Sequence, residues 1–196
     1  QKVGREVAIM ADLQGPKIRV GKFENNKIIL KPGQRFTLDA NCALGNDDVV
    51  GLDYKNLPND VKVGDKLLLN DGLLVIRVES VDQAKIHTIV ELGGELSNNK
   101  GINRAGGGLT APALTDKDKE DLKTAVSLGA DYIAISFPKN ADDMKIAKEL
   151  AEQAFKEFGN KTKLIAKIER AEAVLPGVLE GILEVSDGIM VARGDL

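Results

Sequence analysis

From position 110 onward the chain alternates between helical periodicity and short buried strands, and this alternation limits the possible folds more than any other feature. The expected strands are residues 132–135, 163–168 and 188–192. The expected helices are residues 115–128 and 141–158, and residues 171–183 are expected to be largely helical. A short apolar run at residues 7–11 predicts one more buried strand near the start of the chain. Repeated strand and helix units build a parallel sheet with right-handed crossovers. The sequence therefore predicts an α/β fold.

Each of these strands ends on side chains that can take part in chemistry. Asp12 follows the first strand, Ser136 the second, Lys167 and Glu169 stand at the end of the third, and Asp195 follows the fourth. A TIM barrel places its site at the carboxyl ends of its strands, whereas a dinucleotide-binding sheet carries a Gly-x-Gly-x-x-Gly turn that follows no strand here. Four strands make half of an eight-stranded barrel. We therefore expect a partial TIM (β/α)8 barrel with open edges.

Residues 17–109 have a different character, because short β-type runs alternate with turn signals such as Pro32-Gly33. The expected strands of this segment are residues 27–30, 35–38, 66–69, 73–78 and 86–92. Many short strands at this spacing indicate a small β-barrel or sandwich. The predicted organisation is a partial TIM-barrel domain at residues 1–16 and 110–196, interrupted by an inserted β-rich domain at residues 17–109, which the family resemblance described below implies to be a β-barrel lid.

Lys167 and Glu169 are two residues apart at a strand end, so their side chains can project to the same face. Asp195 would join them from the next strand. Two carboxylates with few other protein ligands suit a Mg²⁺ that keeps open positions for water and for phosphate or carboxylate oxygens. A lysine beside such a metal suits a migrating phosphoryl group or a developing enolate. The alternative is a solvated ion pair after a buried strand, with Asp195 serving an Arg-Gly-Asp turn.

Basic residues at the start and near the end of the inserted segment are further candidates. Lys17 and Arg19 alternate with apolar Ile18 and Val20. They form either the solvent face of a strand or phosphate contacts, in which Arg supplies a planar fork and Lys a point charge. Lys100 lies in a polar turn before a glycine cluster. This turn is either a surface loop or part of a lid that meets nucleotide phosphates on closure.

The composition argues against several classes of partner. The 196 residues include 27 Lys and Arg against 30 Asp and Glu, with a net charge of -3 and 4% aromatic residues, so neither nucleic acid nor a membrane is expected. The single cysteine, Cys42, rules out an internal disulfide. No apolar run reaches the ~20 residues that cross a bilayer, and no signal-peptide pattern is present. We therefore expect a cytoplasmic location. We also expect the sequence to be part of a longer chain, because it starts without Met and stops after a strand-end motif.

A series of motifs resembles the pyruvate kinase family. The motifs are Asp12-Leu13-Gln14-Gly15-Pro16-Lys17-Ile18-Arg19, Asn99-Lys100-Gly101-Ile102-Asn103, Ser136-Phe137, Lys167-Ile168-Glu169 and Met190-Val191-Ala192-Arg193-Gly194-Asp195-Leu196. The resemblance runs through the whole chain and implies a TIM barrel with a small β-barrel lid inserted after its third strand. It also implies a phosphotransferase of glycolysis, which moves the phosphoryl group of phosphoenolpyruvate to ADP and gives pyruvate and ATP through an enolate.

The resemblance assigns roles to individual residues. Glu169 and Asp195 match the protein ligands of a divalent metal, Mg²⁺ or alternatively Mn²⁺, and Lys167 matches the lysine that stabilises the phosphoryl group in flight. The implied substrate contacts are Lys167, the backbone of Gly194, and the pocket residues Ser136 and Phe137. The implied nucleotide-phosphate contacts are Arg19 and Lys100. The implied assembly of the full-length parent is a homotetramer.

One departure from the family pattern concerns a monovalent cation. Members that require K⁺ carry a hydroxyl residue where this chain has Leu13 and an acid where it has Lys17, whereas Asp12 is retained. Leu13 removes an oxygen ligand, and Lys17 can place an ammonium group near the region that the ion would serve. We therefore predict that K⁺ is not required.

Two alternatives to this function remain. A metal-dependent lyase or aldolase on a pyruvate-binding barrel would also use a carboxylate pair with Mg²⁺ to stabilise an enolate. A non-catalytic fragment would bind ligand without chemistry. The resemblance also implies site residues and a C-terminal domain outside these 196 residues, so we expect the 196 residues alone to be inactive.

Overall fold

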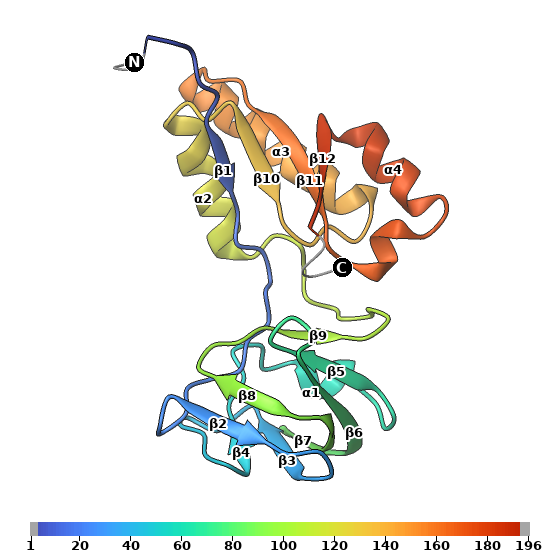
Figure 1. Cartoon of the computed structure of the whole chain (residues 1–196). Helices are drawn as coiled ribbons and strands as arrows, with labels where there is room; N and C mark the ends of the chain where they lie inside the picture. Colours follow the sequence, from blue (N-terminus) through green and yellow to red (C-terminus); the bar gives the residue numbers. More distant parts are fainter. Residues whose placement is uncertain (1–3, 193–196) are drawn as a thin grey trace. The chain divides into compact units, whose positions relative to one another are not determined.

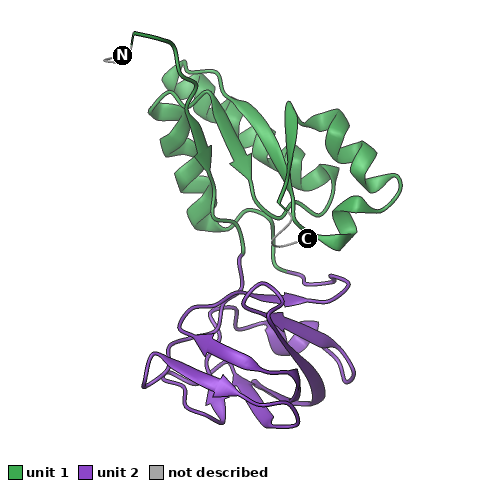
Figure 2. Ribbon diagram, in the orientation of Figure 1, with its two compact units in different colours: residues 1–16, 111–196 green, residues 17–110 purple. Residues whose placement is uncertain are grey.

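The computed structural model describes residues 4–192, and the chain forms two compact units (Figure 1). Unit 1 comprises residues 1–16 and 111–196, and unit 2 comprises residues 17–110 (Figure 2). Unit 2 is therefore an insertion within the sequence of unit 1. Its end falls one residue after the expected boundary at residue 109. That unit 2 acts as a lid stays a prediction.

The sheet of unit 1 is parallel, with the strand order β1-β10-β11-β12. Its strands are β1 (Met10–Asp12), β10 (Tyr132–Ile135), β11 (Lys163–Ile168) and β12 (Gly188–Val191). The register pairs Asp12 with Ala134 and Ile168 with Val191, so the carboxyl ends of the strands meet at one edge of the sheet. The predicted α/β fold is confirmed, whereas closure into a TIM barrel stays a prediction.

Helices connect the strands of unit 1. They are α2 (Asp116–Ser127), α3 (Ala141–Phe158) and α4 (Val178–Val185), with a 3-10 turn η1 (Ala171–Val174) before α4. Thr115 caps α2 as expected, and Asp118 completes a capping box. Residues 171–183, which were expected to be largely helical, form η1 and then α4, and the break between them falls at Pro176, which lacks an N–H donor, and Gly177, whose φ is 80°. Within residues 4–192, none of the helices is both long enough and apolar enough to span a bilayer.

The two faces of the sheet differ in what covers them. In β11, Leu164, Ala166 and Ile168 are buried in one apolar core with side chains of α2 and α3, which lie behind the strands in Figure 1. Because side chains alternate along a strand, Lys167 projects to the opposite face. The periodicity of β11 thus separates a packing face from a face that is free for chemistry.

β1 begins later than the sequence predicts. The expected strand covers residues 7–11, but Val7 and Ile9 precede the observed strand and are 65% and 60% exposed. Within the described residues β1 pairs with β10 on one side, so it forms an edge of the sheet. An apolar run at an edge has no second neighbour to bury it, which explains why the expected burial is wrong.

Unit 2 consists mainly of antiparallel strands. A two-stranded sheet pairs β2 (Lys27–Leu30) with β8 (Gly94–Ser97), and a six-stranded sheet has the order β4-β3-β7-β6-β5-β9. The strands of the larger sheet are β3 (Arg35–Asp39), β4 (Val49–Val50), β5 (Lys66–Leu69), β6 (Leu74–Asp82), β7 (Lys85–Leu92) and β9 (Ile102–Arg104), and a short helix, α1 (Leu57–Asp60), lies between β4 and β5 in the chain. Phe36, Leu38 and Leu67 belong to its separate apolar core. β4, β8, β9 and α1, each of two to four residues, were not predicted, although the equally short β2 and β5 were.

Candidate active site

Four side chains converge at the carboxyl ends of β1, β10 and β11. The Nζ of Lys167 lies 3.1 Å from Oδ1 of Asp12, 3.0 Å from Oγ of Ser136 and 3.1 Å from Oε1 of Glu169. Lys167 and Glu169 therefore share one site, as the alternation of the strand predicts. Asp12 joins them from a distant part of the sequence because β1 and β11 flank the same strand, β10.

Burial increases across this cluster from Asp12 to Glu169. The side chain of Asp12 is 53% exposed, that of Lys167 is 14% exposed, and that of Glu169 is 2% exposed. A buried carboxylate needs compensating partners. Besides Lys167, Glu169 receives a hydrogen bond from the backbone N–H of Phe137, which donates to Oε2 at 2.9 Å. Glu169 is thus buried and held by hydrogen bonds, whereas Asp12 is the member of the cluster that solvent reaches.

The backbone of Phe137 adopts an unusual conformation that serves this contact. Its φ is 58°, in the left-handed region that side chains other than glycine seldom occupy. Such strain persists only where the surrounding structure enforces it, and it is concentrated at functional sites. Here the turn after β10 aims the Phe137 N–H at Glu169, and the Arg170 guanidinium lies 5.8 Å from the centre of the Phe137 ring.

The charge of Lys167 is stabilised by its neighbours. Burial by itself lowers the pKa of the Lys167 ammonium, but hydrogen bonds and charges from Glu169 and Asp12 outweigh this effect, so the pKa of Lys167 is raised above its ordinary value. Lys167 is therefore a cation at neutral pH. It is suited to stabilise negative charge and not to abstract a proton.

The loop after β1 is held tightly against the end of β10. The Oγ of Ser136 donates to the carbonyl oxygen of Leu13 at 2.6 Å. Gly15 has a φ of 66°, and a Cβ at this position would lie 2.7 Å from Cβ of Ser136, so glycine is required there. The N–H of Gly15 donates to the buried carboxylate of Asp118 in α2 at 3.0 Å. Sequence reasoning missed Asp118, for which the available signal was the capping-box pattern at the start of α2.

The residues of the expected monovalent-cation region lie in different units. Asp12 belongs to the cluster around Lys167, and the Leu13 side chain is buried in the apolar core of unit 1. Leu13 therefore offers backbone atoms and no side-chain oxygen. Lys17 belongs to unit 2, where its Nζ lies 4.0 Å from Oδ1 of Asp71.

Arg19 and Lys100 lie close together in unit 2. The Nη1 of Arg19 donates to the carbonyl oxygen of Asn99 at 3.0 Å, and Arg19 forms a β-bridge with Gly101. Arg19 thus contacts the residues on both sides of Lys100 in the sequence. The N–H of Arg19 also donates to Oδ1 of Asp53 at 2.7 Å. Burial raises the pKa of the Asp53 carboxyl, although this hydrogen bond and the charge of Arg19 act in the opposite direction. The structure thus brings Arg19 next to the backbone of the turn that carries Lys100, despite their large sequence separation.

Glu169 fits the requirements of a hard divalent metal. It supplies carboxylate oxygens at the strand edge, which Mg²⁺ and Mn²⁺ prefer. Over residues 4–192, no group of three or more His, Cys, Asp or Glu side chains is arranged to hold a metal ion. The expected second ligand, Asp195, and the expected substrate contact, Gly194, lie outside the described residues. Of the two expected metal ligands, Glu169 is therefore the one that the described residues contain, and its oxygens contact Lys167 and the Phe137 N–H.

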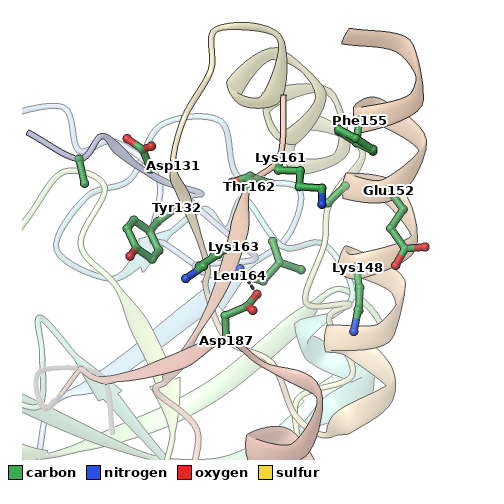
Figure 3. A pocket seen from close by; sticks show the side chains of 12 residues that line it. Asp131, Tyr132, Lys148, Glu152, Phe155, Lys161, Thr162, Lys163, Leu164 and Asp187 are labelled. Carbon is green, nitrogen blue, oxygen red and sulfur yellow. Dashed lines mark hydrogen bonds between the residues drawn. The ribbon is translucent and has the colours of Figure 1, made fainter. Parts of the chain in front are cut away.

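A cavity of about 610 Å³ lies at the other end of the strands (Figure 3). Its lining includes Tyr132 and Lys163, which begin β10 and β11, and Lys148, Glu152 and Phe155 from α3. Its two aspartates have structural roles, because Asp187 accepts the N–H of Leu164 at 2.8 Å and Asp131 accepts the N–H of Ile9 at 2.8 Å. The cluster that can carry chemistry is therefore at the carboxyl ends, away from this cavity.

Comparisons with known proteins agree with the geometry. A family model described as pyruvate kinase, barrel domain, matches residues 1–196. The pyruvate kinase of Haemophilus influenzae is 53% identical over 199 residues, which cover 100% of this chain and 41% of that protein. Pyruvate kinase II of Salmonella typhimurium is 52% identical over 198 residues, covering 100% and 40%. The crystal structure of a pyruvate kinase from Cryptosporidium parvum superimposes with a TM-score of 0.88 at 32% identity and covers 100% of this chain and 40% of that one. The chain thus spans about two fifths of the length of these relatives.

Proposed function

Because this chain belongs to the pyruvate kinase family, we propose that the full-length enzyme containing it transfers the phosphoryl group of phosphoenolpyruvate to ADP and gives pyruvate and ATP, a step of glycolysis. The observation that carries the proposal is the Lys167 cluster, in which an ammonium group lies 3.1 Å from a buried carboxylate at the carboxyl ends of parallel strands. Active sites of TIM barrels lie at these ends. We accordingly propose that unit 1 is part of a TIM (β/α)8 barrel and that unit 2 is its lid.

Lys167 is the proposed catalytic residue. Its ammonium is held beside Ser136 and Asp12, where it can stabilise negative charge on a phosphoryl group between donor and acceptor. Glu169 and Asp195 are the proposed ligands of Mg²⁺ or Mn²⁺, and the bound metal would polarise substrate oxygens and neutralise their charge. The Phe137 N–H keeps one oxygen of Glu169 in place for this role.

The remaining contacts divide between the two units. For phosphoenolpyruvate we propose direct contacts with Lys167 and the backbone of Gly194, in a pocket that Ser136 and Phe137 line. For the phosphates of ADP and ATP we propose Arg19 and Lys100, which lie together in unit 2. We further propose that the full-length enzyme is a cytoplasmic homotetramer with no nucleic-acid or membrane partner. The 196 residues alone would not catalyse the reaction.

K⁺ independence is a specific prediction for this enzyme. Leu13 directs its side chain into the apolar core and supplies no side-chain oxygen ligand, and Lys17 supplies an ammonium group where members that require K⁺ carry an acid. We expect kcat of the full-length enzyme in buffer free of K⁺, Na⁺ and NH₄⁺ to stay within about twofold of kcat with K⁺ added, because a fixed ammonium replaces a mobile cation. Initial rates with tetramethylammonium salts keep the ionic strength constant. A large stimulation by K⁺ would refute this prediction.

The nearest alternative is a metal-dependent lyase or aldolase, which would also place an ammonium beside a metal-binding carboxylate. ADP distinguishes the two activities. We expect pyruvate formation from phosphoenolpyruvate and Mg²⁺ to depend on ADP, whereas a lyase or aldolase has no need of a nucleotide. Binding of nucleotide by the full-length enzyme without turnover would instead support a non-catalytic role.

A further inference from the structure

Ser136 has both of its hydrogen-bonding functions engaged within the protein. A serine hydroxyl carries one hydrogen to donate and lone pairs to accept. The hydrogen of Ser136 goes to the carbonyl oxygen of Leu13 at 2.6 Å, so the lone pairs are left to accept from Nζ of Lys167 at 3.0 Å. The residue is 1% exposed. Ser136 is therefore oriented toward Lys167 and has no hydrogen left to donate to a substrate.

All N–H donors of the Lys167 ammonium likewise have acceptors within the protein. It has three N–H donors, and among residues 4–192 its acceptors are Asp12, Ser136 and Glu169. Ser136 and Glu169 are buried, whereas Asp12 is 53% exposed. An anionic group arriving from solvent can replace Asp12 without uncovering either buried acceptor. The two buried acceptors thus hold the ammonium in place, and the N–H that donates to the exposed Asp12 can donate to a ligand instead.

We propose that Ser136 is a positioning residue that holds the Lys167 ammonium toward its exposed side, by donating to Leu13 and accepting from Lys167. The identity of the group that Lys167 meets, a phosphoryl group in transfer, rests on the proposed function. Without the hydroxyl, one ammonium N–H loses its buried acceptor, and the flexible lysine stem can carry the charge toward Glu169 or Asp12. Ser136 therefore acts through Lys167 and does not itself touch the reacting atoms.

The first test compares Ser136→Ala with Thr88→Val in the full-length enzyme. Thr88 is an equally buried hydroxyl that donates to the carbonyl oxygen of Phe36 at 2.7 Å, but it lies in β7 of unit 2, and no hydrogen bond joins it to a lysine of the described residues. We expect Ser136→Ala to lower kcat by about ten- to a hundredfold with KM for phosphoenolpyruvate changed less than about threefold. Thr88→Val should lower the thermal stability to a similar extent and leave kcat unchanged.

The second test needs no activity. In the full-length enzyme labelled with ¹⁵N-lysine, three hydrogen bonds should slow proton exchange of the Lys167 ammonium enough for its NMR signal to be detected. Lys167→Met identifies that signal by removing it. We expect Ser136→Ala to shift and broaden it, and Thr88→Val to leave it in place.

Two results would overturn the inference. One is a kcat for Ser136→Ala equal to that of Thr88→Val, and the other is a Lys167 ammonium signal that Ser136→Ala does not alter. If the wild-type enzyme formed no pyruvate, the proposed function would fail, and the NMR comparison would still decide the role of Ser136.

Discussion

Lys167→Met should lower kcat for pyruvate formation by the full-length enzyme by about 10³- to 10⁵-fold. Methionine keeps an unbranched apolar side chain but removes the cation that lies 3.1 Å from both Asp12 and Glu169. A phosphoryl group in transfer would then meet two carboxylates without an ammonium between them. Initial rates at saturating phosphoenolpyruvate, ADP and Mg²⁺ measure the effect.

Lys163→Met is the matched control for this substitution. Lys163 begins the same strand, β11, and lies on the same face as Lys167, but at the amino end. It is exposed, and we expect its replacement to leave kcat within about twofold of the wild type, as is usual for a surface substitution. If Lys167→Met reduced kcat no more than Lys163→Met, the role assigned to Lys167 would be wrong.

The second large effect concerns the stability of unit 2. Arg104 in β9 contacts Asp65 through two parallel hydrogen bonds, Nε to Oδ2 at 2.9 Å and Nη2 to Oδ1 at 3.1 Å. Their side chains are 18% and 13% exposed. Arg104→Met leaves the Asp65 carboxylate largely buried without its cation, so we expect a loss of about 2–4 kcal/mol in the free energy of unfolding. Urea unfolding of the 196-residue chain, followed by amide NMR signals of β5 and β6, measures this loss.

The effect of Arg104→Met should depend on pH. Burial by itself raises the pKa of the Asp65 carboxyl, but hydrogen bonds and charges from Arg104 and Lys62 outweigh it, so the pKa of Asp65 is below its ordinary value. A carboxyl whose pKa is lower in the folded state stabilises the fold above its unfolded pKa, and this stabilisation is lost as pH falls through the folded pKa. The difference between wild type and Arg104→Met should therefore shrink from about pH 5 downward.

Arg35→Met provides the control for the stability measurement. Arg35 lies 3.7 Å from Glu79, but its side chain is 88% exposed, and an exposed pair of this kind contributes about 0–1 kcal/mol. We expect little change in the free energy of unfolding at any pH. A loss for Arg104→Met as small as that for Arg35→Met, or one that stayed constant into the acid range, would contradict the assigned role of the Asp65 pair.

Much of the fold could be predicted because some segments have unambiguous periodicity. Residues 163–168 alternate cleanly, and β11 has the predicted bounds, as does α3 with its apolar face. The prediction that residues 171–183 are largely helical agrees with η1 and α4, whereas the break at Pro176 and Gly177 was not predicted. The apolar run at residues 7–11 indicated a buried strand, but its burial depends on a neighbouring strand that local sequence does not specify.

Some contacts of the candidate site could likewise be predicted from the sequence, and others could not. The proximity of Lys167 and Glu169 follows from strand alternation, which is a local rule. The contacts of Lys167 with Asp12 and Ser136 depend on which strands are neighbours, and the left-handed backbone of Phe137 is imposed by packing around it. Asp118 was missed because its capping pattern predicts a helix start and not a hydrogen bond to Gly15.

Phosphorus NMR of the full-length enzyme with phosphoenolpyruvate, ADP and Mg²⁺ tests most directly whether the Lys167 cluster belongs to a phosphoryl-transfer site. We expect the phosphoenolpyruvate signal to decline as the γ-phosphate signal of ATP grows by an equal amount, with no reaction when ADP is omitted and none detectable on the same time scale with Lys167→Met. Release of inorganic phosphate without ATP, or an unchanged rate with Lys167→Met, would contradict the account.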